Sequence, residues 1–325
     1  MITLRHLNIF LLSCLLMLIY PTLYSQENSI FENYYLSPSV INPATSGAEY
    51  HPTANIAVKR QWSGFPDTPT TFILTGCYRL GSFDFYDLKG MINKGPLRSS
   101  GRVGLGGTIF RDVNGPMTTT GVIIAYAYHI PLNDKSSLSL GLSALGTWYT
   151  FNNALLKPDE PNDPYLMSGN DNIFRPNFNL GAYYYHQNFF IGFSANRLLP
   201  DIMGVNDNIK TQPGFFLMGG YKFLQNTNSI IIEPSIMINK PAGNQLSVDI
   251  HTKLYIKRLH WIALSYSTTQ RINLRFGIRL YKMLYAGYNY EYTLGELASY
   301  QFGSHEIHLG INLGLVGIEG TKKMR

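Results

Sequence analysis

Apolar and polar residues alternate strictly along residues 245–293. In the segment 246–256, the side chains on one face are apolar except for Thr252, and those on the other face are polar or charged. The segment 271–280 places Ile, Leu and Phe on one face and Arg, Asn and Gly on the other. Successive side chains of a strand point to opposite faces, so this period of two predicts β-strands. The short segments between them predict antiparallel neighbours.

The length of these strands separates two classes of β-protein. The strands of soluble sandwiches usually have about 5–6 residues, whereas a tilted strand that crosses a bilayer needs about 9–11. The strands of this region are close to the longer value. In an outer-membrane barrel the apolar row faces lipid and the polar row faces the lumen. The pattern therefore predicts an all-β fold, a transmembrane outer-membrane β-barrel, in preference to a soluble sandwich.

The same patterning predicts about fourteen antiparallel strands, an even number as in bacterial single-chain barrels. The expected strands are 53–62, 70–80, 102–112, 122–128, 138–144, 178–185, 189–196, 215–223, 230–238, 246–256, 261–266, 272–280, 284–292 and 307–315. If the chain starts in the periplasm, the turns near Pro131 and His186 are periplasmic and short. The loops at 152–174 and 198–213 are then external and long, as is usual. The connection 81–100 departs from this rule because it would be periplasmic and long.

Both ends of the chain lie outside the alternating region. Residues 1–25 have the features of a secretory signal peptide, with Arg5 and His6 before an apolar run and a small residue at Ser25. Residues 26–52 show little alternation, and we expect an irregular periplasmic segment there. The barrel is then predicted to span 53–315 and to be followed by a basic tail at 316–325.

Composition supports the barrel and excludes other classes. Only 14% of the residues are charged, against about 25% in soluble domains, and the chain contains 23 Tyr and 30 Gly. After the N-terminus there is no apolar run of about 20 residues, which a transmembrane helix would need. The net charge of +6 is scattered without a run of five basic residues, so we expect no nucleic-acid partner. Removal of the signal peptide would leave Cys77 as the only cysteine, which excludes an internal disulfide.

No motif in the chain predicts enzymatic chemistry. His305, Glu306 and His308 are close in sequence, but a zincin needs His-Glu-x-x-His on a helix, and here the spacing is wrong and the context is a strand. We expect Glu306 and His308 to share the lumen face instead. Gly104, Gly106 and Gly107 lie within a strand pattern with no following helix, so close packing or strand bending explains them better than phosphate binding. We therefore expect no enzyme, no metal and no cofactor.

Charged residues on the polar face of several strands predict a row of charges inside the lumen. Arg271, Arg275 and Arg279 alternate along one strand, and Asp249, Glu233 and Glu291 lie on strands expected nearby. Two interpretations remain, an anion-selective strip and a plug-like network of ion pairs, and the second is favoured.

Short motifs along nearly the whole mature chain resemble the PorP/SprF family of the Bacteroidota type IX secretion system. They include Asn42-Pro43-Ala44 with Gly47, Arg60-Gln61-Trp62-x-Gly64-Phe65, Pro69-Thr70-Thr71, Gly104-x-Gly106, Asp112 with Gly115-Pro116, Tyr126-Ala127-Tyr128-His129-Ile130-Pro131, Asp163-Pro164, Pro176-Asn177-Phe178, Ile191-Gly192-Phe193-Ser194, Tyr288-Asn289-Tyr290 and Gly303-Ser304-His305-Glu306. Each motif alone is weak, and their order along the chain makes the resemblance specific.

The resemblance implies a set of positions with structural or partner-binding roles. They are Asn42, Pro43, Gly47, Gln61, Trp62, Gly64, Pro69, Asp112, Gly115, Pro116, His129, Ser304, His305 and Glu306. It also implies an outer-membrane component of type IX secretion or gliding, with periplasmic and outer-membrane secretion components, a secreted adhesin and outer-membrane lipid as partners. Because a lumen of about fourteen strands is narrow, we expect docking or anchoring rather than conduction of a folded protein.

Other functions remain open at this point. One is a passive porin or small-solute channel, and another is a structural barrel without a role in secretion. A barrel enzyme that acts on lipid would need a catalytic cluster that the sequence does not show. Residues 26–52 and 81–100 are either contacts with periplasmic partners or elements that plug and brace the barrel.

Overall fold

The computed structural model describes residues 35–49, 52–65, 67–80, 102–133, 135–152, 172–199, 213–224, 230–240, 246–256, 260–281 and 283–312. The strands are β1 (Thr53–Arg60), β2 (Thr70–Arg79), β3 (Val103–Asn114), β4 (Met117–Asn133), β5 (Ser136–Phe151), β6 (Asn172–His186), β7 (Phe189–Asn196), β8 (Gly214–Tyr221), β9 (Phe223–Leu224), β10 (Ile230–Lys240), β11 (Ser247–Ile256), β12 (His260–Ser267), β13 (Arg271–Tyr281), β14 (Leu284–Thr293) and β15 (Ser304–Asn312). Three short 3-10 helices accompany them: η2 (Pro38–Val40), η3 (Pro43–Thr45) and η6 (Glu296–Tyr300). The described part of the chain contains no helix that is both long and apolar enough to cross a membrane.

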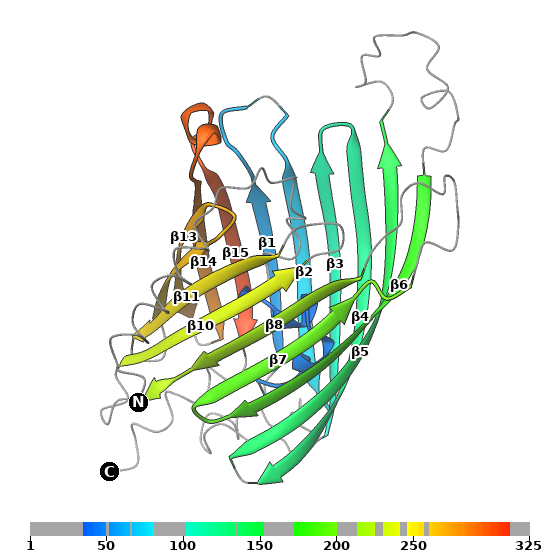
Figure 1. Ribbon diagram of the computed structural model, residues 1–325, viewed down its shortest axis with the longest axis vertical. Helices are drawn as coiled ribbons and strands as arrows, with labels where there is room; N and C mark the ends of the chain where they lie inside the picture. The colour runs from blue at the N-terminus through cyan, green and yellow to red at the C-terminus, as the bar shows by residue number, and fades with distance from the viewer. Residues whose placement is uncertain are drawn as a thin grey trace, which may run out of the picture.

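The strands form one closed antiparallel barrel (Figure 1). Each strand pairs with its neighbours in sequence, and β15 pairs with β1 from Thr53 opposite Asn312 to Arg60 opposite His305. β9 continues β8 after Lys222, and both segments pair with β10. β8 and β9 therefore count as one strand, and the fifteen strand segments of the sheet form a barrel of fourteen strands. The predicted fourteen-stranded barrel is confirmed.

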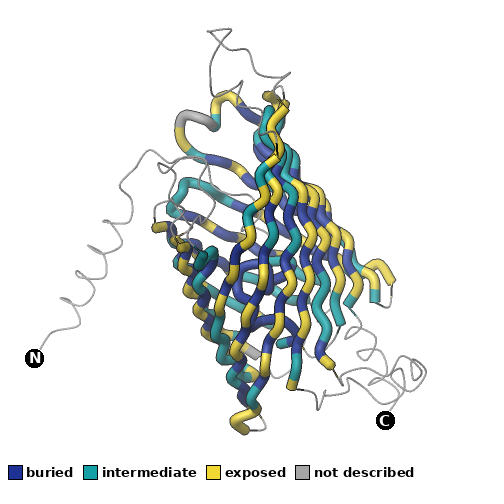
Figure 2. Tube along the Cα trace, turned by 90° about the vertical axis from the view of Figure 1, so that its right-hand side faces the viewer, coloured by how far each residue is buried: buried dark blue, intermediate teal, exposed yellow. Residues whose placement is uncertain are grey.

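Buried and exposed residues alternate along the strands of the barrel (Figure 2). The outer face carries exposed apolar side chains such as Ile124 (67% exposed) and Ile307 (62%). The inner face buries polar ones such as Lys59 (2%) and His308 (1%). Burial alternates as the sequence predicted over 247–252 of β11 and 273–278 of β13. This inside-out distribution is the one expected of a strand sheet solvated by lipid.

Three strands extend well beyond their predicted bounds. β4, β5 and β6 contain 17, 16 and 15 residues, because their upper parts continue the ladder without apolar alternation. The predicted tight turn from Pro131 is wrong at its start, since Pro131 belongs to β4 and pairs with Ser137. Pro176 lies in β6 before its pairing with β7 begins at Leu180, and a strand with one free edge tolerates proline.

Other differences lie at the ends of the barrel. The last strand begins at Ser304 and not at Ile307 as predicted. The expected signal peptide, the connection 81–100 and the tail 316–325 lie outside the described residues.

Candidate functional site

Residues 35–49, called the lumen segment below, lie inside the barrel (Figure 1, dark blue). Ser37 and every residue from 39 to 47 are buried. Pro38 and Pro43 each begin a 3-10 turn, as expected because the fixed φ of proline suits the first position of a helical turn. The described part of the predicted periplasmic segment 26–52 contains 3-10 turns and no strand, and it is surrounded by the strands of the barrel.

Two neighbouring apolar residues anchor the lumen segment to different parts of the wall. Val40 packs in a cluster of residues from β1 to β5: Ala57, Ile73, Phe110, Ile123 and Leu145. Ile41, which is fully buried, packs against Phe216, Met218 and Met237 of β8 and β10. Complete burial of such a side chain stabilises a protein by about 1.5–3 kcal/mol. The segment therefore bridges two sides of the barrel.

Glycines of the inner wall make room for the backbone and for the side chains of Asn42 and Ser46 in the lumen segment. We call this set the glycine wall: Gly104, Gly106, Gly141, Gly181 and Gly192, from β3, β5, β6 and β7. A Cβ atom at Gly141 would collide with the backbone of Ala44, and one at Gly104 would collide with the carbonyl of Ser46. The close packing expected at Gly104 and Gly106 is confirmed, whereas a Cβ at Gly107 would have no neighbour within 4 Å.

Asn42 satisfies all of its side-chain hydrogen-bonding groups at the centre of this contact. Its Oδ1 accepts from the backbone N–H of Ala44 at 3.0 Å. Its Nδ2 donates to the carbonyls of Ala182 on β6 (3.2 Å) and Phe193 on β7 (3.3 Å). Asn42 is 0% exposed, so an unsatisfied amide would cost about 1–3 kcal/mol. The side chain needs both an acceptor and two donors, which only an amide provides.

The far end of the lumen segment is held by His129 and Gly47. The Nε2 of His129 lies 2.8 Å from the carbonyl oxygen of Ser46, and its Nδ1 lies 3.1 Å from the hydroxyl of Tyr185. Arg79 donates to that hydroxyl at 3.1 Å and to the carbonyl of Gly47 at 3.5 Å. Gly47 has φ +75°, and a Cβ atom there would lie 3.0 Å from the Cα of Gly104, so a side chain there would be strained and crowded.

A second cluster joins the first and last strands at the other end of β1. The N–H of Gln61 donates to the carbonyl of Pro69 (2.9 Å), and Ser63 and the segment 302–303 exchange two backbone hydrogen bonds. The N–H of Trp62 donates to Ser304 Oγ at 3.3 Å. Gly64 has φ +110° and lies against the ring of Phe302. These contacts close the barrel seam between β1 and β15.

Buried charges reinforce this seam from inside the lumen. Lys59 Nζ lies 3.4 Å from Glu291 Oε2, and Arg271 lies 4.0 Å from the same oxygen. Ser304 donates to the other oxygen of Glu291 at 3.3 Å. Glu306 is buried opposite Lys59 in the strand register. A buried carboxylate needs such paired charges and donors, because removal of one partner leaves an uncompensated charge.

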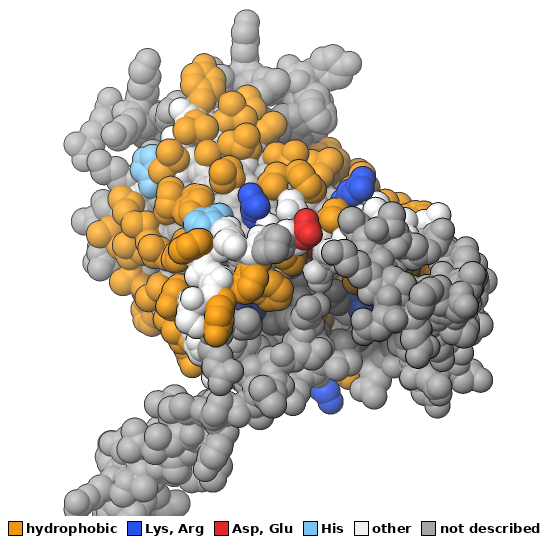
Figure 3. Space-filling model, turned by 90° about the horizontal axis from the view of Figure 1, so that it is seen from above, with side chains coloured by type: hydrophobic (Ala, Val, Ile, Leu, Met, Phe, Trp, Pro, Cys, Tyr) orange, Lys and Arg blue, Asp and Glu red, His pale blue; other side chains and the backbone are white. Residues whose placement is uncertain are grey.

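The remaining motif residues lie along the upper parts of the neighbouring strands. Asp112 accepts a hydrogen bond of 2.6 Å from Thr71 of β2. Gly115 and Pro116 form the turn from β3 to β4, and the carbonyl of Pro116 accepts from the N–H of Asn152. His305 points to the outer face, where its Nδ1 lies 2.6 Å from the Tyr288 hydroxyl. Viewed from this end, hydrophobic side chains cover most of the described outer surface (Figure 3).

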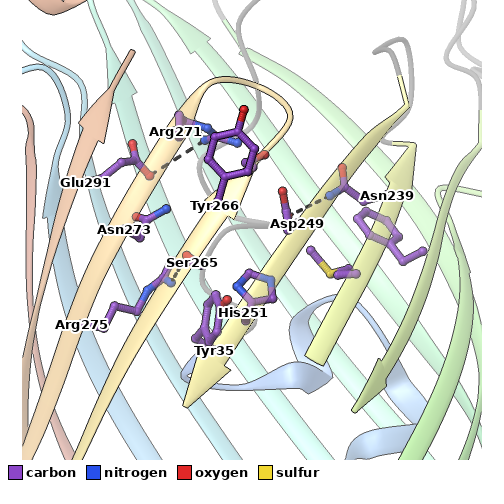
Figure 4. A pocket seen from close by; sticks show the side chains of 13 residues that line it. Tyr35, Asn239, Asp249, His251, Ser265, Tyr266, Arg271, Asn273, Arg275 and Glu291 are labelled. Carbon is purple, nitrogen blue, oxygen red and sulfur yellow. Dashed lines mark hydrogen bonds and ion pairs between the residues drawn. The ribbon is translucent and has the colours of Figure 1, made fainter. Parts of the chain in front are cut away.

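Tyr35 marks the boundary between two spaces in the lumen. The guanidinium of Arg275 lies 3.8 Å from the centroid of its ring, and His251 meets the ring edge-on at 4.5 Å. Above it lies a small polar pocket of about 30 Å³, bordered by Arg271, Asn273 and Asp249 among others (Figure 4). Below it lies a larger cavity of about 570 Å³. Tyr35 lines both spaces.

One expected ion pair of the arginine row is present, since Arg271 pairs with Glu291. Glu233 pairs with Lys222 at 3.6 Å, and Asp249 accepts from Asn239 at 3.1 Å. Lys59, which sequence analysis did not include, is the closer partner of Glu291. The sequence could have identified Lys59 as a lumen residue, because it lies on the polar face of a predicted strand.

Glu306 and His308 share the inner face, as the alternation predicted. Within the described residues, no group of three or more His, Cys, Asp and Glu side chains is placed to hold a metal ion.

The structure thus brings most of the motif residues, but not all, into two groups. Asn42, Pro43, Gly47 and His129 meet at the glycine wall, and Gln61, Trp62, Gly64, Pro69 and Ser304 meet at the seam. Sequence reasoning missed the wall glycines Gly141 and Gly181, whose only signal is a glycine on the polar face of a strand. It also missed Asn196, which donates to the carbonyl of Ile41 at 2.9 Å.

A family model described as "Type IX secretion system membrane protein PorP/SprF" matches residues 23–311. The comparison with curated proteins gave no match. Among solved structures, the chain is similar to the outer membrane protein Omp33 of Acinetobacter baumannii, with a TM-score of 0.48, 9% identity, and coverage of 81% of this chain and 98% of that chain. It is also similar to a TodX monoaromatic hydrocarbon channel mutant (TM-score 0.46, 8% identity, 85% and 92% coverage). A third similar structure is KdgM porin (TM-score 0.37, 11% identity, 80% and 98% coverage).

Proposed function

The chain belongs to the PorP/SprF family of type IX secretion system membrane proteins, and we propose that it serves that system as a docking and anchoring barrel. In this role the barrel holds secreted surface adhesins, periplasmic machinery partners, or both, at the outer membrane. Its role is non-enzymatic, and the polypeptide cargo does not pass through its lumen.

The observation that carries this proposal is the lumen segment. Residues 39–47 are buried inside the barrel and are attached to β3, β5, β6, β7, β8 and β10 by close glycine contacts, hydrogen bonds and apolar packing. A secreted polypeptide in the same lumen would have to displace all of these contacts. A barrel that is filled by its own chain is better suited to present surfaces than to conduct cargo.

The alternative of a passive porin is less well supported by the same geometry. A porin lumen is a water-filled channel, whereas residues 39–47 of this chain are buried within the lumen and packed against its wall. Larger solutes would therefore meet the lumen segment before they crossed the barrel.

The proposal is tested by deleting the gene and comparing the surface and medium proteomes with those of the parent. The docking role predicts that large secreted adhesins are lost from the surface of the deletion strain. Their release into the medium would indicate a defect in anchoring, and their retention in the periplasm would indicate a defect in export. If surface proteins are unchanged and only the uptake of small solutes falls, the channel alternative replaces the proposal. Complementation with the intact gene is the control.

A second measurement separates docking from conduction. The purified barrel is inserted into planar bilayers, and its conductance is compared with that of a known open porin. A filled lumen predicts conductance far below that of the porin. A stable, porin-sized conductance of the intact protein would contradict the proposal.

A further inference from the structure

Positive charge on the outer face of the barrel wall is confined to one end. Among the outward-facing residues of the described strands there is no Asp or Glu, and the only Lys and Arg residues are Arg60, Arg111 and Lys240. All three are exposed and lie at or near the C-terminal ends of β1, β3 and β10, which run in the same direction in the antiparallel sheet (Figure 1). At this end, called the upper end below, the connections 152–171 and 197–213 join β5 to β6 and β7 to β8. Longer connections of such barrels are external, so we expect the upper end to face the cell exterior.

Exposed aromatic rings mark the membrane interface at the upper end. Tyr300 and Phe302, in the connection between β14 and β15, are 71% and 76% exposed. The N–H of Phe302 donates to the carbonyl of Ser63 at 2.7 Å, three residues after Arg60 in the chain. Aromatic residues of outer-membrane barrels form girdles at the two interfaces of the bilayer. Arg60 therefore lies at the depth of the lipid headgroups, where lipids carry their phosphate groups.

The guanidinium of Arg60 is only partly used by the protein itself. Its Nε donates to Thr68 Oγ1 at 2.6 Å, and its two Nη groups make no hydrogen bond to the described residues. Within the described part of the chain, neither Arg60 nor Arg111 forms an ion pair, and the nearby loop carboxylate Asp67 forms none either. A guanidinium offers parallel N–H donors that match the oxygens of a phosphate group. Both arginines are therefore available to an anion from outside the chain.

Strand geometry places Arg60 and Arg111 within reach of one headgroup. Arg111 lies opposite Phe72 of β2, and Phe72 lies opposite Val58 of β1, two residues before Arg60. Neighbouring strands are about 4.8 Å apart and rise about 3.4 Å per residue, so the two arginine Cα atoms are separated by about 12 Å. Two long arginine side chains on the same face can approach one lipid headgroup from both sides across such a distance.

The outward neighbours of Arg111 are polar, unlike those of Lys240. Thr120 of β4 lies opposite Arg111, and Thr118 lies two residues further up the same face. Their hydroxyl groups can donate hydrogen bonds to phosphate oxygens. Lys240 lies opposite Phe215 instead, and it has no second outward-facing Lys or Arg on a neighbouring described strand. The two arginines thus form a cluster, whereas Lys240 is isolated.

We propose that Arg60 and Arg111 bind the phosphate groups of a lipid in the outer leaflet of the outer membrane. Thr118 and Thr120 add hydrogen bonds to the same headgroup. Phe72, which lies between the two arginines in the register and is 48% exposed, packs against the acyl chains of that lipid. This site goes beyond the docking role proposed above, because it lies on the outer wall of β1 to β4 and not in the lumen.

The site is tested with lipid A as the probe. The purified full-length barrel is stripped of lipid in detergent and titrated with lipid A, and the bound fraction is measured by native mass spectrometry. Arg60→Gln and Arg111→Gln combined are expected to weaken binding about thirtyfold, because each basic residue beside an anionic headgroup contributes about fivefold. Lys240→Gln is the matched control, since it removes an exposed outward-facing cation at the same end, and its affinity should equal that of the native protein.

A second probe identifies the part of the lipid that is recognised. Lipid A from which the phosphates have been removed should bind the native protein as weakly as intact lipid A binds the double variant. Heat-modifiable migration on gels verifies that every variant is folded. Equal binding of the two lipids by the native protein would overturn the proposal, because acyl chains alone would then explain the affinity. Native-like affinity of the double variant, or an equal loss in Lys240→Gln, would overturn it as well.

Discussion

The two sides of the barrel interior meet the lumen segment in different ways. On the packed side, formed by β3 to β7, glycines let the backbone of residues 42–46 touch the wall, and hydrogen bonds fix its direction. On the cavity side, which includes β8, β10 and β11, larger side chains such as Met218, Met237 and Tyr255 border a space of about 570 Å³ that also reaches the lower ends of β6 and β7. The contrast shows that small wall residues allow direct contact between the wall and the lumen segment, whereas larger ones border a space beside it.

Asn42→Asp is expected to have the largest effect, because it breaks the packed side at its centre. The carboxylate would face the carbonyl oxygens of Ala182 and Phe193 with no donor to offer, and an uncompensated buried charge costs about 3–5 kcal/mol. Unfolding in urea, followed by tryptophan fluorescence, measures the loss. Asn133→Asp is the matched control: only the Oδ1 of Asn133 is used, so its stability should hardly change. Equal stability of both variants would contradict the assignment.

Gly141→Ala tests the steric basis of the packed side. Its Cβ would collide with the backbone of Ala44, so we expect a loss of about 3 kcal/mol in the free energy of unfolding. Gly107→Ala is the control, because nothing lies within 4 Å of its new methyl group. The same urea titration measures the free energy of unfolding of both variants. If Gly107→Ala loses as much as Gly141→Ala, the glycines contribute only to strand formation and not to the contact with the lumen segment.

Ile41→Ala tests how strongly apolar packing anchors the lumen segment on the cavity side. Ile41 contacts Phe216, Met218 and Met237, and buried Ile→Ala substitutions cost about 2–5 kcal/mol. We expect about 2 kcal/mol here, because flexible methionines can partly fill the gap. Ile124→Ala, at a lipid-facing residue that is 67% exposed, should cost less than half as much. A cost for Ile41→Ala equal to that of this control would mean that the lumen segment is not anchored on this side.

Tyr35→Leu is expected to have the smallest effect, at the border of the two spaces. It removes the ring that Arg275 covers at 3.8 Å, a contact worth about 1 kcal/mol. Tyr35→Phe keeps the ring and should stay within about 0.5 kcal/mol of the native protein. Thermal unfolding of the three proteins compares them. An equal loss for Phe and Leu would assign the contribution to the hydroxyl instead of the ring.

Much of the wall could be predicted from the sequence because the alternation of a strand has a strict period. The inner and outer faces of β11 and β13 followed from that period alone. The upper parts of β4 to β6 did not, because residues such as Thr118–Thr120 are polar on both faces and give no alternation.

The location of the lumen segment could not be predicted in the same way. Residues 35–49 have no period that assigns them a face, and the partners of Asn42 lie about 140–150 residues away in the chain. The motif resemblance identified Asn42, Pro43, Gly47 and His129, but only the folded barrel shows that they meet. Gly141 lies on the polar face of a predicted strand, but this position alone does not identify a contact, because the absence of a side chain is informative only when its neighbour is known.

The most direct test of the central claim locks the lumen segment in place during secretion. Ser39 Oγ lies 3.3 Å from Cys77 Sγ, so Ser39→Cys places two sulfur atoms close enough for a disulfide bond to form with little movement. The account predicts that cells with the oxidised variant display adhesins on their surface at the same level as cells with Ser39→Cys and Cys77→Ser combined. Loss of surface adhesin in the locked variant, with recovery after reduction, would show that cargo needs the lumen and would contradict the account.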